Sequence, residues 1–105
     1  MNIIEYIPMG HDNLITREEL VRRTGESDRK IRMAIRSAQN AGHEIINVDG
    51  GYFRYKDEDD LPYLRTYYMR ERARAHDCML KQRIVRRMYE RHDANQITLE
   101  EFGWG

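Results

Sequence analysis

Basic side chains with the chemistry of nucleic-acid contact gather in residues 27–41. At helical spacing, Arg29 and Arg36 share one face with Met33. An arginine donates two hydrogen bonds at once to a phosphate or to the O6 and N7 edge of guanine, and a methionine can pack against a thymine methyl group. We therefore predict that this segment contacts DNA. The residues with this assignment are Ser27, Arg29, Lys30, Arg32, Met33, Arg36 and Asn40.

Asp28 works against this prediction. A carboxylate repels phosphate unless it caps the helix or accepts a hydrogen bond from a cytosine amino group. The alternative interpretation is a solvated helix face whose bases balance the neighbouring acids Glu18, Glu19 and Glu26. Inside a DNA-binding fold, the pattern favours contact with DNA over a solvated face.

A second candidate surface lies around Asp49-Gly50, where Tyr52, Arg54 and Lys56 could follow a minor groove or a phosphate backbone. Only two of these side chains are basic and Asp49 sits at the tip, so the electrostatic case is weak. The alternative is that the segment only closes a core with its apolar side chains. The residues outside 27–41 that we predict to contact DNA are Thr16, Arg17, Gly51, Tyr52 and Arg54.

The reactive side chains show no catalytic pattern. The histidines are too far apart in sequence to suggest a metal site, and Cys78 follows His76 by two residues, so the pair would not face one another on a helix. No glycine-rich phosphate loop and no nucleophile elbow is present. We expect neither an enzyme nor a bound metal or cofactor. The histidines are His11, His43, His76 and His92.

The chain has 105 residues, enough for one domain with a modest core. Its net charge is zero, and residues 1–60 carry twelve acids against nine bases, whereas many DNA-binding domains are basic. The single cysteine excludes an internal disulfide and suits a reducing cytosol. No apolar run approaches the ~20 residues of a membrane span, and no signal-peptide pattern is present. We expect a cytoplasmic protein that does not contact a membrane.

Short elements are predicted to precede the basic segment. A helix is expected over residues 2–7 and a short strand over residues 14–15. Thr16 then opens a helix with Glu19 three residues later, which predicts a capping box where each side chain accepts a hydrogen bond from an orphaned backbone N–H. Gly25 ends that helix, because glycine adopts a left-handed conformation at low cost.

The basic segment is itself predicted to be a helix over residues 27–41, capped by Ser27 or Asp28 and ended by Gly42. Its apolar residues recur with a period near 3.6, so one face should point into a core. The predicted inward positions are Ile31, Ala34, Ile35, Ala38 and Ala41.

A β-hairpin is predicted next. Residues 44–48 and 51–55 are rich in β-branched and aromatic side chains. They are joined by Asp49-Gly50, a dipeptide that tolerates the positive φ angles of a tight turn. The fold class that follows is mainly α with a small β-hairpin wing, an α+β protein that ends in a long helix.

One long helix is predicted from Leu61 to about His92, with Pro62 tolerated in its first turn. Between residues 61 and 92 there are nine Arg or Lys against three acids. A heptad frame puts apolar or aromatic residues at seven of ten core positions, interrupted at Glu71 and Gln82, which favours a homodimer through this helix. The predicted dimer contacts are Leu61, Leu64, Tyr68, Ala75, Cys78, Val85 and Tyr89.

Two alternatives for the long helix remain: its basic residues extend a phosphate footprint, or it folds back over the domain. Residues 93–105 are expected to form a flexible tail that ends in Phe102-Gly103-Trp104-Gly105. That tail could dock on another protein, or its aromatic residues could pack back on the chain. The predicted divisions are a domain over 1–56, a long basic helix over 57–92 and the tail.

The stretch from Thr16 to Tyr55 resembles the winged helix-turn-helix domain of biotin-repressor N-terminal type. Together with the long helix, residues 2–90 look like small DNA-binding proteins encoded by phages and prophages of Gram-positive bacteria. The resemblance implies sequence-specific binding of duplex DNA through a recognition helix and a wing, in transcription regulation or DNA replication, without enzymatic activity. The matching residues are Glu19-Leu20, Gly25, the run Ser27-Asp28-Arg29-Lys30-Ile31-Arg32, and the wing from Gly42 to Phe53.

A rival interpretation is a protein–protein interaction module. In that case the core would have lost DNA binding, and the helical arm and aromatic tail would hold another protein. The zero net charge and the acidic balance of residues 1–60 favour this rival. The concentration of bases on residues 27–41 and on the long helix favours DNA.

Overall fold

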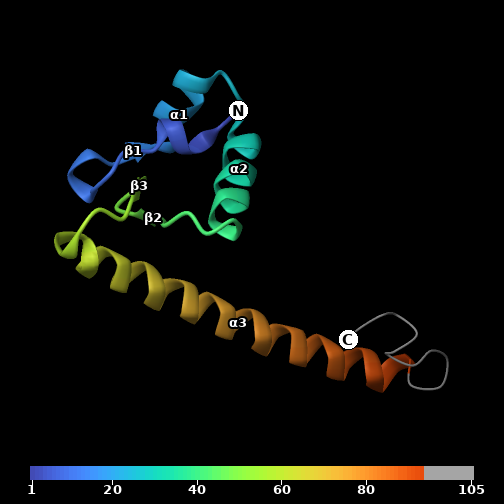
Figure 1. Ribbon diagram of the computed structural model, residues 1–105. Helices are drawn as coiled ribbons and strands as arrows, with labels where there is room; N and C mark the ends of the chain where they lie inside the picture. The colour runs from blue at the N-terminus through green and yellow to red at the C-terminus, as the bar shows by residue number, and fades with distance from the viewer. Residues whose placement is uncertain (94–105) are drawn as a thin grey trace. The chain divides into compact units, whose positions relative to one another are not determined.

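The computed structural model describes residues 1–93, which are mostly helical with a small antiparallel sheet and a long C-terminal helix (Figure 1). The chain divides into two compact units, the first spanning Met1–Met69 and the second beginning at Arg70. The helices and strands are η1 (Ile3–Tyr6), η2 (His11–Asn13), β1 (Ile15–Thr16), α1 (Arg17–Thr24), α2 (Asp28–Asn40), β2 (Ile45–Val48), β3 (Gly51–Arg54), η3 (Glu58–Asp60) and α3 (Leu61–Asp93). Of the predicted tail, only Asp93 is described, as the last residue of α3, and residues 94–105 lie outside the described residues.

The first helix is shorter and tighter than a regular α-helix. The predicted segment 2–7 forms the 3-10 helix η1, with the Asn2 side chain accepting a hydrogen bond from the Ile4 N–H at 3.3 Å. Only four residues are helical, and Pro8 follows closely. A helix of this length makes few internal hydrogen bonds, so the buried Ile3 and Ile7 hold it against the core.

The start and end of α1 follow the predicted capping residues. The Thr16 Oγ1 accepts a hydrogen bond from the Glu19 N–H at 3.2 Å, and Gly25 has a φ of 72°. The second half of the predicted capping box is replaced, because the Glu19 carboxylate binds Arg22 and Arg23 on its own helix. These guanidinium groups, Arg22 first and then Arg23, hold the pKa of Glu19 below its usual value.

Helix α2 is confirmed almost to its predicted ends. The Ser27 Oγ caps it by accepting from the Lys30 N–H at 3.3 Å. The predicted inward face is buried at Ile31 and Ile35 and partly buried at the two alanines between and after them. Ala41 is a correction, because it is exposed. It stands at the C-cap, one residue before the chain turns at Gly42, so it no longer follows the helical face.

The sheet has the order β1-β3-β2, with both pairs antiparallel. Asp49 and Gly50 have φ angles of 52° and 78°, as the hairpin prediction required. The predicted short strand lies one residue later than expected, at Ile15–Thr16, and pairs with β3. Gly51 is needed at this pairing, because a side chain there would come within 2.9 Å of the Ile15 carbonyl oxygen.

Each face of the sheet is covered by an apolar cluster. Neighbouring residues of a strand point to opposite faces. The inner cluster comprises Ile3, Ile7, Ile15, Leu20, Ile31, Ile35, Ile45 and Tyr52. The outer cluster comprises Ile46, Val48 and Phe53, against which Leu14, Tyr55, Tyr63, Leu64 and Tyr67 pack. The first turns of α3 therefore complete the core of the first unit, on the sheet face opposite α1 and α2.

A polar contact joins the two layers at the edge of the sheet. The Gln39 Nε2 of α2 donates hydrogen bonds to the Ile45 carbonyl oxygen and to the Tyr67 hydroxyl, both at 2.9 Å. This contact fixes the start of α3 against the end of α2 and the start of β2.

The second unit is helical from Arg70 to Asp93 (Figure 1). Its side chains up to His92 are exposed with few exceptions. Its exposed apolar residues are Met79, Leu80, Ile84, Val85 and Met88. No helix within residues 1–93 has the length and the apolar character that crossing a membrane requires.

Candidate nucleic-acid interface

The outer face of α2 carries the largest group of sequence-predicted site residues. A shallow depression of about 270 Å³ is lined by Arg29, Arg32, Met33 and Arg36. Met33 is 60% exposed between the arginines, although a methionine is normally a core residue. Because Ile31 and Ile35 hold the opposite face in the core, this set of side chains is fixed to face outward.

Acids neutralise part of this basic face. The Asp28 carboxylate forms ion pairs with the Arg17 Nε at 2.5 Å and with the Arg32 Nε at 3.2 Å. The Lys30 Nζ lies 3.5 Å from a Glu26 carboxylate oxygen. To bind DNA, Arg17, Lys30 and Arg32 would have to leave their acidic partners and contact phosphates. The free-energy cost is small, because exposed ion pairs contribute little to stability.

Arg29 and Arg36 are the two bases of α2 that have no acidic partner within residues 1–93. Both are exposed and lie seven residues apart, two turns along the same face. Their guanidinium groups therefore keep all their donors for a ligand. Asp28 has a different role from the cap that the sequence suggested: it holds Arg17, from the start of α1, beside α2.

Two of the remaining polar residues of this surface are helix caps that accept hydrogen bonds from backbone N–H groups. Thr16 and Ser27 are exposed, and each caps its own helix. Asn40 is exposed at the last helical position of α2. These three side chains lie at the surface where they were predicted.

The wing differs from the prediction. Gly51 and Tyr52 were expected to contact DNA, but both are buried, and Tyr52 is only 7% exposed within the inner cluster. Both faces of β3 are covered, so the alternation of the strand leaves neither residue at the surface. Arg54 is partly buried, and its Nε donates a hydrogen bond to the Ile7 carbonyl oxygen at 2.8 Å. The surface of the wing is its tip, Asp49 and Gly50.

The wing tip is bound to a residue that sequence reasoning did not select. The His11 Nε2 lies 2.8 Å from an Asp49 carboxylate oxygen, and the His11 ring stacks on the Tyr63 ring with centroids 3.6 Å apart. The edge of Phe53 completes the contact at 5.5 Å. These partners are 38 to 52 residues away in the chain, so no local spacing could have indicated them.

Asp60 fixes the same region from below the surface. It is 4% exposed, and its two carboxylate oxygens accept hydrogen bonds from the His11 N–H at 3.0 Å and the Lys56 N–H at 2.8 Å. Burial alone would raise the pKa of Asp60, but the N–H donors of His11 and Lys56, together with the backbone of Asp57, hold that pKa below its usual value.

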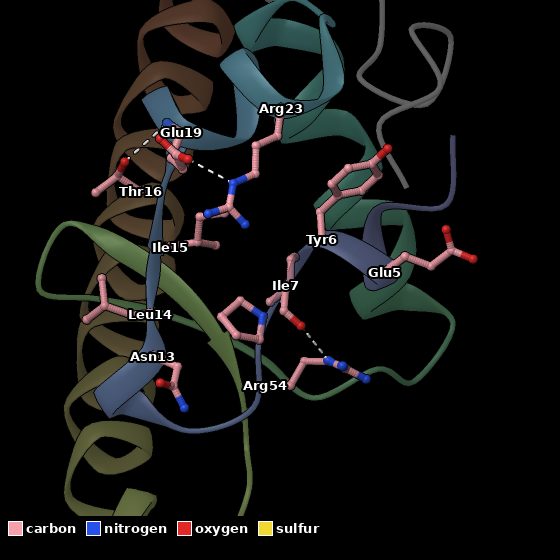
Figure 2. A pocket seen from close by; sticks show the side chains of 11 residues that line it. Glu5, Tyr6, Ile7, Asn13, Leu14, Ile15, Thr16, Glu19, Arg23 and Arg54 are labelled. Carbon is pink, nitrogen blue, oxygen red and sulfur yellow. Dashed lines mark hydrogen bonds and ion pairs between the residues drawn. The ribbon is translucent and has the colours of Figure 1, made fainter.

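A separate cleft of about 510 Å³ lies between β1 and the N-terminal segment (Figure 2). Figure 2 shows the Arg23 and Arg54 side chains reaching toward it from α1 and β3. Each uses its Nε for an internal contact, Arg23 with Glu19 at 2.8 Å and Arg54 with Ile7. Glu5 and Glu19 also line the cleft, so its charges balance and favour no particular ligand.

The residues predicted for dimerisation separate into two groups. Leu64 is a correction: it packs on the sheet in the outer cluster, so it belongs to the core of the first unit. Leu61, Tyr68 and Val85 are 42%, 59% and 40% exposed, and Ala75 and Cys78 are exposed as well. Tyr89 is half-buried.

Comparison of the chain with protein-family models, with curated proteins and with solved structures gives no match. Within the described residues, no three His, Cys, Asp or Glu side chains are placed to hold a metal ion together. The function must therefore be inferred from the surfaces of the chain itself. The outer face of α2 holds the largest group of the predicted site residues.

Proposed function

We propose that this protein binds duplex DNA through the outer face of α2. The observation that carries the proposal is the pair Arg29 and Arg36, exposed, without acidic partners in residues 1–93, and two helical turns apart around Met33. An arginine in this setting can contact phosphate or read guanine in the major groove. Arg17 and Arg32, held beside them by Asp28, would add phosphate contacts.

The order of the elements supports a winged helix-turn-helix. Helix η1, strand β1, helices α1 and α2, and the hairpin β2–β3 follow one another, with β1 pairing on β3. In that family the second helix of the helix-turn-helix lies in the major groove. We propose that α2 has this role, and that the buried Gly51 and Tyr52 of the hairpin do not contact DNA.

The deciding experiment is fluorescence anisotropy of a labelled random-sequence duplex titrated with protein at low salt. We expect Arg29→Gln with Arg36→Gln to weaken binding by at least about tenfold, because each lost phosphate contact removes a counterion-release contribution that is large at low salt. The matched control is Arg22→Gln with Arg23→Gln, which removes two charges from α1 that pair with Glu19. Equal affinities of the two double variants would rule out α2 as the contact surface.

The biological setting that we propose follows the resemblance to small phage and prophage proteins. The role would be transcription regulation or DNA replication in the cytoplasm of a Gram-positive host. Selection of a bound site from a random duplex pool would supply the recognised sequence.

We further propose that the protein acts as a homodimer through α3. The exposed apolar residues of the predicted seam support this, since Leu61, Tyr68 and Val85 are each at least 40% exposed. A two-fold protein also matches palindromic half-sites. The same exposed residues favour the rival function, an interaction module that holds another protein without binding DNA. Absence of duplex binding at low salt would favour that rival.

A further inference from the structure

The second unit carries a row of bases along one face of α3. Arg72, His76, Arg83 and Arg87 are spaced by four, seven and four residues, which places them on one side of a helix with 3.6 residues per turn. All four side chains are exposed. The residues from 70 to 93 include eight Arg or Lys against four Asp or Glu, a net charge of +4 in a chain whose net charge is zero.

Five arginines of the second unit differ in whether they have an acidic partner. Arg74 pairs with Glu71 and Arg86 pairs with Glu90, each at 3.3 Å. Arg72, Arg83 and Arg87 have no acidic partner within residues 1–93. Three arginines without acidic partners therefore share the face of the row, whereas Lys81 lies on the opposite side of the helix.

We infer that this row, which we name the α3 basic row, is a second DNA-contact surface that binds the phosphate backbone of the duplex. The inference rests on the proposed function and extends it beyond α2. From Arg72 to Arg87 the row is about 22 Å long at 1.5 Å per residue, so it can reach several successive phosphates of one strand. Phosphate contacts carry no sequence information, and the row therefore supplies affinity while α2 supplies specificity.

A helix with bases and methionines could instead lie on an anionic membrane. Such a helix needs one broad apolar face to enter the headgroup region. In the second unit no such face exists, because the side of α3 that carries Ile84, Met88 and Val85 also carries charged residues at helical spacing, namely Arg74, Asp77 and Lys81. The arrangement therefore favours a polyanion that binds from outside, as duplex DNA does.

The experiment compares two double variants of the full chain that remove the same charge from the same helix. Arg72→Gln with Arg83→Gln removes two of the four basic side chains of the row. Arg74→Gln with Arg86→Gln removes two arginines that are paired with acids. Glutamine has a helix propensity close to that of arginine, so both variants should keep the helical signal in circular dichroism. Affinity for a random-sequence duplex is measured over a salt series by anisotropy.

We expect the slope of log K against log salt to become shallower by about 2 in the row variant, since each lost phosphate contact contributes about 0.9. The paired-arginine variant should change the slope by less than half of that. Equal changes in the two variants would mean that net charge alone matters, and would overturn the inference.

Two further outcomes separate this inference from the proposed function. A row variant with wild-type affinity and slope, while Arg29→Gln with Arg36→Gln still weakens binding, would overturn the α3 basic row and leave α2 in place. A wild-type protein that does not bind duplex at low salt would refute both. Row-dependent binding to vesicles of anionic phospholipid, with unchanged DNA binding, would assign the row to a membrane surface instead.

Discussion

The Asp60 carboxylate is buried where two segments of the first unit meet, and each of its oxygens accepts a backbone N–H, from His11 and from Lys56. An ionised carboxylate in such a place is tolerated because charged hydrogen bonds replace its water. The residue thereby holds η2 and the connection before α3 together. The function of Asp60 is structural. These hydrogen bonds explain why Asp60 is buried although it belongs to the acidic run of residues 57–60.

Asp60→Asn should destabilise the protein by about 1–3 kcal/mol. An asparagine offers one accepting oxygen, and its NH₂ group would face one of the two backbone N–H donors. The loss can be measured by urea unfolding followed by circular dichroism. Asp59→Asn is the control, because Asp59 is exposed, and it should change the free energy of unfolding by less than about 0.5 kcal/mol. Equal losses would show that the buried hydrogen bonds of Asp60 contribute nothing.

The stability that Asp60 contributes should depend on pH in a defined direction. Its pKa is lower in the folded state than in the unfolded chain, so the contribution is complete above the unfolded value and is lost as the pH falls through the folded one. The difference in unfolding free energy between wild type and Asp60→Asn should therefore shrink from pH 7 to pH 3. A difference that stays constant over this range would contradict the lowered pKa.

Among the elements, those defined by local chemistry could be predicted from the sequence and those defined by distant packing could not. Helices α1 and α2 begin directly after their caps Thr16 and Ser27, because a hydroxyl cap accepts a hydrogen bond from an N–H only three residues away. The hairpin likewise follows from the backbone freedom of Asp49-Gly50. The burial of Tyr52 could not be foreseen, since it requires knowing that both faces of β3 are covered.

The start of α3 shows the same limit. The heptad frame placed Leu64 at a helix–helix contact, because a long apolar pattern is consistent with a partner helix. The structure uses Leu64, with Tyr63 and Tyr67, to cover the outer face of the sheet instead. A periodic pattern specifies which residues share a face of a helix, but it does not specify what packs on that face.

Gly51→Ala should be the most damaging small substitution in the sheet. Its Cβ would collide with the Leu14 side chain and approach the Ile15 carbonyl oxygen, so β1 would have to move away from β3. We expect a loss of about 1–3 kcal/mol in urea unfolding, as for an overpacked core. Gly50→Asn tests the turn instead, where open space surrounds the residue and asparagine tolerates a positive φ. It should cost less, and the reverse order would contradict the close approach.

At the scale of the whole molecule, the charges are separated along the chain. The net charge of zero conceals twelve acids and nine bases in residues 1–60 and a net +4 in residues 70–93. The total charge therefore does not indicate which partners the protein binds. The ion pairs of individual side chains are more informative, because they show which basic residues have no acidic partner. The candidate surface on α2 was predictable residue by residue, but the pairing of Arg17 with Asp28 was not, because these two residues come from different helices.

The proposed homodimer predicts a mass that depends on the protein concentration. Sedimentation equilibrium should give about twice the chain mass of 12.7 kDa at tens of micromolar protein. Val85→Glu should shift the protein toward the monomer, because it places a charge on an exposed apolar side of α3. Thr66→Glu serves as the control for added charge at an exposed position of the same helix. A wild-type monomer under these conditions would exclude pairing through α3.

The hydrogen bonds of Asp60 also have a consequence for the exchange of backbone amides with solvent. The N–H of Lys56 lies between β3 and η3, outside any helix or strand, and that of His11 lies at the start of the single turn η2. Amides in such segments usually exchange rapidly with deuterium. Here both are bound to a buried carboxylate, so they open only when the first unit opens there. These two amides therefore report on whether the hairpin, the N-terminal segment and the first turn of α3 separate together or one at a time.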